Sequence, residues 1–143
     1  MGKDLLVVIT QLNGSMTGPD SVRLTEKFVE GSRAYVDYWK GPVKVLMHHE
    51  IDASGNLDSR DYDLSNLPFH IGLIDFNNLE NIKRETKNAT AVLGSIGHQL
   101  TGLAQYLRDH QVVYILQTEI SFKTRLHIIR ADIGNRVKRL RRY

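Results

Sequence analysis

The amino-acid sequence predicts an α/β fold: a Rossmann-like three-layer sandwich with a mainly parallel sheet of about five strands and a long basic helix near its C-terminal end. Two observations carry this prediction. The segments Leu5–Ile9 and Val112–Leu116 are continuous apolar runs, which are typical of strands covered on both faces. Amphipathic segments alternate with such runs, and this alternation favours βαβ units with right-handed crossovers.

The bulk composition fits one domain spanning residues 1–143. Hydrophobic residues make up 41% of the chain and charged residues 24%, which is ordinary for a soluble globular protein. No segment is apolar for long enough to cross a bilayer, and no signal-peptide pattern is present. Cysteine is absent, which excludes disulfides, a cysteine nucleophile and thiolate metal ligands. We therefore expect a cytoplasmic protein.

The elements of the first half follow from local patterns. Leu5–Ile9 is the expected first strand, and Thr10–Pro19, with two glycines and a proline, is the expected loop after it. Asp20 or Ser21 can cap a helix that ends before Gly41-Pro42. Its apolar positions fall on one face: Leu24, Phe28, Tyr35 and Trp39. Val43–Met47 is the expected second strand.

The second half alternates in the same way. Residues 50–67 are polar and rich in turn formers, which predicts a surface loop. The remaining expected elements are strand Phe69–Ile74, helix Leu79–Lys87, strand Thr90–Ser95, a helix with Ile96, Leu100, Leu103 and Leu107 on one face, strand Val112–Leu116, and a helix from about Phe122 with Leu126, Ile129, Ile133, Val137 and Leu140 on its apolar face.

A glycine-containing stretch follows the first expected strand and precedes a helix. It comprises Gly14, Ser15, Met16, Thr17 and Gly18. Glycines in this position let backbone N–H groups approach an anion or a sugar, and the helix dipole favours negative charge. The stretch lacks the third glycine of the dinucleotide fingerprint and the lysine of a Walker A loop. A plain connecting turn is the alternative interpretation.

Two further polar segments follow the fourth and fifth expected strands. In Ser95-Ile96-Gly97-His98, the histidine lies in a first helical turn, where it can act as a base or bind a hydroxyl group. A solvated histidine is the alternative. Gln117-Thr118-Glu119 can line the same edge, with Lys123 and Arg125 available for a phosphate or carboxylate. Alternatively, Glu119 only balances those cations.

A metal site is disfavoured. His48-His49-Glu50 places two histidines side by side, but adjacent residues of a strand point to opposite faces. The positive charge, by contrast, is concentrated near the C-terminal end. Between residues 122 and 143, Asp132 is the only acidic residue, whereas eight residues are basic: Lys123, Arg125, Arg130, Arg136, Lys138, Arg139, Arg141 and Arg142.

The basic segment has three interpretations. Its cations can form a solvated helix face, or Arg136–Arg142 can contact an acidic membrane surface, which would make the protein peripheral to the membrane. Binding to nucleic acid phosphates is disfavoured because aromatic residues do not alternate with the basic ones. A homodimer is compatible with the sequence.

The pattern resembles the N-terminal domain of GT-B-type, group 1-like glycosyltransferases. The segments that carry the resemblance are Asp4–Ile9 with Gly14 and Gly18, the Asp20–Trp39 helix, Ala91–His98, Val113–Glu119 running into Thr124-Arg125-Leu126, and Ile128–Arg142. The resemblance implies an acceptor-binding domain that transfers sugar only together with a second domain, which holds the nucleotide-sugar donor. It implies no cofactor in this domain.

The resemblance also implies roles for the polar segments. The acceptor side would be built from Gly14–Gly18, Ser95–His98 and Gln117–Glu119, with His98 as the candidate catalytic residue and Arg125 nearby. Residues 1–143 would then be the N-terminal part of a longer two-domain chain and inactive alone. The alternative from another class is a non-catalytic, flavodoxin-like binding or regulatory domain. The chain lacks the acidic cluster of a phosphoreceiver and the hydroxyl-rich phosphate loop of a flavin site.

Overall fold

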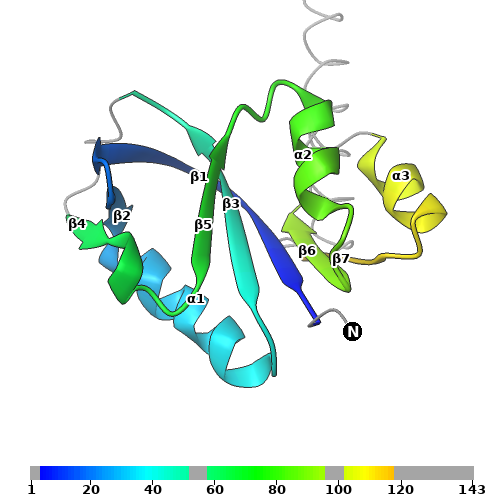
Figure 1. Cartoon of the computed structure of the whole chain (residues 1–143), viewed down its shortest axis with the longest axis horizontal. Coiled ribbons are helices and arrows are strands. Elements are labelled where there is room, and N and C mark those ends of the chain that lie inside the picture. Colours follow the sequence, from blue (N-terminus) through cyan, green and yellow to red (C-terminus); the bar gives the residue numbers. More distant parts are fainter. Residues whose placement is uncertain (1–3, 52–57, 96–101, 118–143) are drawn as a thin grey trace, which may run out of the picture.

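The computed structural model describes residues 4–51, 58–95 and 102–117 (Figure 1). These residues form strands and helices in the order β1 (Leu6–Gly18), β2 (Ser21–Thr25), α1 (Glu26–Tyr38), β3 (Val43–His49), β4 (Ser59–Asp63), the 3-10 turn Leu64–Asn66, β5 (His70–Ile74), α2 (Leu79–Thr86), β6 (Ala91–Ser95), α3 (Leu103–Asp109) and β7 (Val113–Gln117). None of the helices within these ranges is long and apolar enough to span a membrane.

Parallel pairing organises one part of the sheet. Strand β1 pairs with β3 on one side and with β6 on the other, β3 pairs with β5, and β6 pairs with β7, all in parallel. Counted along the chain, these five strands have the spatial order 3-2-1-4-5, which is the order of doubly wound dinucleotide-binding sheets. The α/β class predicted from the sequence is confirmed.

The prediction of a mainly parallel sheet of about five strands is wrong, because the sheet is mixed and contains seven strands in the described residues. The C-terminal half of β1 pairs antiparallel with β2, and β2 pairs antiparallel with β4. Strand β1 therefore continues through Thr10–Gly18, and β4 takes up part of residues 50–67, although both segments had been expected to be loops. The long basic helix expected from Phe122 lies outside the described residues.

The first helix begins later than expected. Helix α1 starts at Glu26, and the Thr25 hydroxyl caps it by accepting a hydrogen bond from the Phe28 N–H at 3.2 Å. Neither Asp20 nor Ser21 caps it, since Ser21 begins β2. Alternate residues of β2 are buried, as in a strand with one covered face. Leu24 therefore belongs to the sheet and not to the helix.

Helices pack on both faces of the sheet. Successive residues of β1 and β3 enter opposite cores, because side chains alternate across a strand. One core joins α1 to the sheet and includes Val8, Val45, Met47, Val29 and Phe69. The other joins α2 and α3 to the sheet and includes Val7, Leu46, Val92, Ile82 and Leu107. Figure 1 shows α2 and α3 beside β6.

Strand β7 does not have the fully covered environment that its sequence suggested. Within the described residues it pairs only with β6. Tyr114 packs toward α3, whereas Val113 and Ile115 on the opposite face are 58% and 51% exposed. The apolar run correctly predicted a strand, but not burial of both its faces.

The turn after β4 depends on an ionised carboxylate. Asp63 accepts hydrogen bonds from the backbone N–H of Ser65 at 3.0 Å and from its hydroxyl at 2.8 Å. These two donors lower the pKa of Asp63 below its usual value of 3.8. A lowered folded-state pKa stabilises the protein above the unfolded-state pKa, and this contribution is lost as the pH falls through the folded-state pKa.

We therefore expect Asp63→Asn to reduce the melting temperature at pH 7, with a smaller difference from the unmodified protein at pH 3. Thermal unfolding followed by circular dichroism at both pH values measures this. Asp20→Asn serves as an exposed carboxylate control. An equal difference at both pH values would contradict the assignment.

Candidate functional site

The pairing between strands β1 and β6 ends before either strand does. Their pairing covers Leu6–Val8 and Ala91–Leu93. Beyond it, β1 shifts its register against β3 between Ile9 and Asn13, while β6 continues beside β7 as far as Ser95. The chain also reverses its direction of travel across the sheet here, since β3 and β5 lie on one side of β1 and β6 and β7 on the other. Open α/β sheets bind their ligands at such switch points.

His48 lies at this edge, where β3 ends. Its register partners are Asn13 on β1 and Ile74 on β5. The Phe76 N–H donates a hydrogen bond to His48 Nδ1 at 3.0 Å, and an Asp75 carboxylate oxygen lies 3.8 Å from the same nitrogen. Because Nδ1 accepts, the proton of the neutral ring is on Nε2. His48 is thereby oriented as a hydrogen-bond donor.

Asn13 and Glu50 connect the ends of β1 and β3. The Asn13 side-chain amide donates to a Glu50 carboxylate oxygen at 3.1 Å, and the Glu50 N–H donates to the Gly14 carbonyl at 2.9 Å. Both side chains are exposed. Together with His48 and Asp75, they place an amide, an imidazole N–H and two carboxylates along one short stretch of the edge.

The stretch Gly14–Gly18 is not a loop at a helix N-terminus. It is part of β1, and Ser15, Met16 and Gly18 pair with β2. A Cβ on Gly14 would lie 2.8 Å from Leu73 Cδ2, so close side-chain packing is what requires this glycine. The N-terminus of α1 is instead satisfied by Thr25 and by Asp58, whose carbonyl accepts from the Glu26 N–H at 3.2 Å. The expectation of a loop between a strand and a helix N-terminus is therefore wrong, whereas ligand binding by these residues stays a prediction.

Two other predicted site residues do come together. Ser95 and Gln117 are register partners at the carboxyl ends of β6 and β7. The remaining predicted site residues lie outside the described part of the chain: Gly97, His98, Thr118, Glu119 and Arg125.

The sequence analysis did not assign His48, Glu50 or Asp75 to this edge. The available signal was their position, since His48-His49-Glu50 follows the buried run Val43–Met47 and Asp75 follows Phe69–Ile74. His48 and His49 were considered only as metal ligands. Within residues 4–51, 58–95 and 102–117, no group of three or more histidine, aspartate or glutamate side chains is arranged to hold a metal ion.

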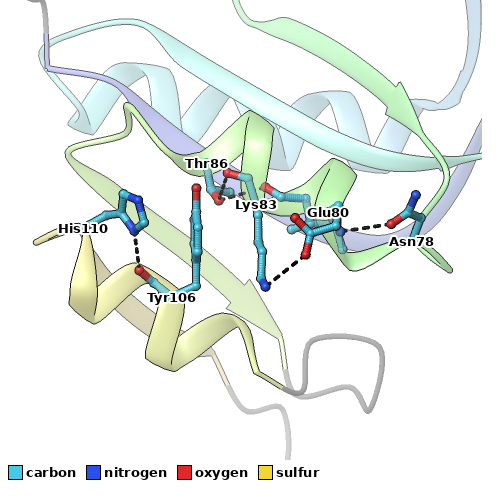
Figure 2. Close-up of polar contacts among 7 residues, drawn as sticks. Asn78, Glu80, Lys83, Thr86, Tyr106 and His110 are labelled. Atoms are coloured by element: carbon cyan, nitrogen blue, oxygen red, sulfur yellow. Dashed lines mark hydrogen bonds and ion pairs between the residues drawn. The ribbon is translucent and has the colours of Figure 1, made fainter.

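Helices α2 and α3 lie side by side and are joined by a side-chain contact (Figure 2). Lys83 Nζ lies 5.3 Å from the centre of the Tyr106 ring and also pairs with Glu80 at 3.1 Å. The Tyr106 and His110 rings are 4.1 Å apart, and His110 Nδ1 lies 2.8 Å from the Tyr106 carbonyl. The cation–π contact joins α2 to α3, whereas the contact between the Tyr106 and His110 rings lies within α3 and its C-terminal end. Comparisons with protein-family models, curated proteins and solved structures found no match for this chain.

Proposed function

We propose that this chain is the acceptor-binding domain of a GT-B-type glycosyltransferase, which transfers a sugar from a nucleotide-sugar to a hydroxyl-bearing acceptor. One observation carries the proposal: polar side chains gather at the carboxyl edge of strands in the order 3-2-1-4-5, next to the point where β1 and β6 separate. The resemblance to the N-terminal domain of group 1-like glycosyltransferases gives this edge its proposed ligand. The acceptor domain would work with a donor-binding domain in the same enzyme.

The chemistry of the edge suits a sugar-like acceptor. Each hydroxyl group of a sugar donates one hydrogen bond and accepts others, so its site needs both kinds of partner. His48 Nε2 offers a donor, and Glu50 and Asp75 offer acceptors. In the transfer, the acceptor oxygen bonds to the anomeric carbon, the bond from that carbon to the phosphate oxygen breaks, and the nucleotide leaves. The acceptor proton passes to a base, for which His98 is the sequence-based candidate.

The strand order weighs against the alternative of a flavodoxin-like binding or regulatory domain. Flavodoxin-like sheets have the order 2-1-3-4-5, in which the third strand lies between the first and the fourth. Here β1 lies between β3 and β6, and β5 lies outside β3. No other feature of the described residues favours that alternative.

The proposal is tested with residues 1–143 and two sets of probes. NMR titration with methyl glycosides of glucose, galactose, mannose and N-acetylglucosamine is expected to show weak binding, with Kd of about 1 mM or above, equivalent to about −4 kcal/mol or weaker. Calorimetry and turnover assays with UDP-glucose and GDP-mannose are expected to show no tight binding and no transfer, because positioning the donor supplies much of the rate. Tight nucleotide-sugar binding or turnover by this chain alone would contradict the proposal.

A point substitution at the edge makes the test specific. His48→Asn keeps an acceptor near the Phe76 N–H, but its shorter side chain does not carry its amide donor as far as the position of Nε2. We expect it to weaken glycoside binding about three- to tenfold, as loss of one hydrogen bond of about 0.5–1.5 kcal/mol implies. The control His49→Asn changes the neighbouring exposed histidine and is expected to leave affinity unchanged. Equal affinities of both variants and the unmodified protein would remove His48 from the site.

A further inference from the structure

The Tyr114 side chain lies across Gly94 at the carboxyl end of β6. Tyr114 is the register partner of Val92, whereas Gly94 pairs with Leu116 two residues further along. A Cβ added to Gly94 would nevertheless lie 3.1 Å from Tyr114 Cε2 and 3.2 Å from its hydroxyl oxygen. The ring therefore leans from the level of Val92 toward the edge where β1 and β6 separate. A side chain at position 94 would therefore contact the ring more tightly than side chains normally do, and the ring would have to shift.

Tyr114 and His48 lie on the same face of the sheet. Tyr114 packs with the core that includes Leu46 and Val92, beneath α2 and α3. His48 follows Leu46 by two residues on β3, so its side chain lies on that face, and its ring contacts Phe76 of the same core. Strand β1 and the point of separation lie between these two side chains. They flank the switch point from β7 and from β3.

The Tyr114 hydroxyl has no hydrogen-bond partner among the described residues. Neither a backbone group nor a side chain in the described ranges donates a hydrogen bond to it or accepts one from it. The Tyr114 side chain is only partly buried. Burial raises the pKa of Tyr114 above its usual value of 10.0, so the hydroxyl stays protonated at neutral pH.

A packing role alone does not account for this hydroxyl. Phenylalanine would fill the same space beside Gly94 and Leu107 without a polar atom. Within the described residues no group hydrogen-bonds this hydroxyl, so a bound ligand can supply its partner.

We propose that Tyr114 is a ligand-contacting residue of the carboxyl edge, whose hydroxyl donates a hydrogen bond to an oxygen of the acceptor sugar bound between Tyr114 and His48. Gly94 is the positioning residue, because its missing side chain lets the ring reach the edge. This inference rests on the proposed acceptor function and adds a specific contact on the far side of the switch point.

The test compares Tyr114→Phe with the unmodified chain, using the four methyl glycosides above. The variant keeps the ring and is expected to have an unchanged or slightly higher melting temperature. Its affinity for the glycoside that the unmodified chain binds best is expected to fall about three- to tenfold, as loss of one hydrogen bond implies. Tyr38→Phe is the matched control, because Tyr38 is 88% exposed at the end of α1 and remote from the carboxyl edge.

The outcomes distinguish the two proposals. Equal glycoside affinity of Tyr114→Phe and the unmodified chain overturns the Tyr114 contact and leaves the acceptor function standing. No binding of any glycoside by the unmodified chain overturns both. A second variant, Gly94→Ala, is expected to displace the ring and to weaken binding at least as much as Tyr114→Phe, and unchanged affinity in a folded Gly94→Ala protein also counts against the contact.

Discussion

Replacing Leu46 with alanine is expected to lower the free energy of unfolding by about 2–5 kcal/mol. Leu46 is fully buried in the middle of β3, in the core beneath α2 and α3. The substitution removes three carbon atoms from a site surrounded by strands on both sides, which cannot collapse freely into the space. Urea denaturation of residues 1–143 measures the change.

The matched control for this experiment is Leu12→Ala. Leu12 lies on β1, next to β3 in the sheet, but its side chain is 42% exposed, so the expected change is within about 0.5 kcal/mol. A change at Leu46 no larger than that at Leu12 would contradict the burial of Leu46 in the core. Aggregation of the Leu46→Ala protein at low denaturant concentration would be consistent with the large expected loss.

Replacing Gly72 with alanine is expected to cost about 1–3 kcal/mol, because the added methyl group overpacks the sheet. Gly72 on β5 is the register partner of Leu46, and its Cβ would lie 2.7 Å from Leu46 Cδ2. In the Leu46→Ala background this methyl group has room. The double variant is therefore expected to be more stable than the sum of the two single changes by about 0.5–3 kcal/mol.

Gly31→Ala makes the same chemical change as Gly72→Ala but is expected to change the free energy of unfolding in the opposite direction. Gly31 lies on the exposed side of α1, and nothing lies within 4 Å of its missing side chain. Alanine in a helix is more favourable than glycine by about 0.5–1 kcal/mol, so this variant is expected to gain stability.

Additive effects of Gly72→Ala and Leu46→Ala in the double-mutant cycle would contradict the register of β3 and β5.

The strands of the parallel part were predictable because their signal is local. Val7 and Val8 belong to a run of apolar residues, and each enters a different core, as the absence of a polar face requires. Strand β2 was missed because Ser21–Thr25 follows Gly18 and Pro19, which suggested the end of a loop and a helix cap. Its alternation of polar and apolar residues was the available signal, since such alternation indicates a strand with one covered face.

The candidate site was less predictable because it depends on register between strands. The rule that polar residues follow buried strands located Ser95 and Gln117 correctly at the edge. It applied equally to His48, but no local pattern places Asn13 opposite His48. That pairing arises from the register shift of β1 after Ile9. Glycine was a misleading signal, because Gly14 accommodates Leu73 and has no left-handed backbone conformation.

The central claim is that the carboxyl edge at the separation of β1 and β6 binds the acceptor. It is tested most directly by mapping amide chemical-shift changes of ¹⁵N-labelled residues 1–143 during titration with the four methyl glycosides. The account predicts that the largest changes cluster at Asn13, His48, Gly94 and Tyr114, from four strands that meet at this edge. Changes confined to α1, β2 and β4, or an absence of changes throughout the titration, would contradict it.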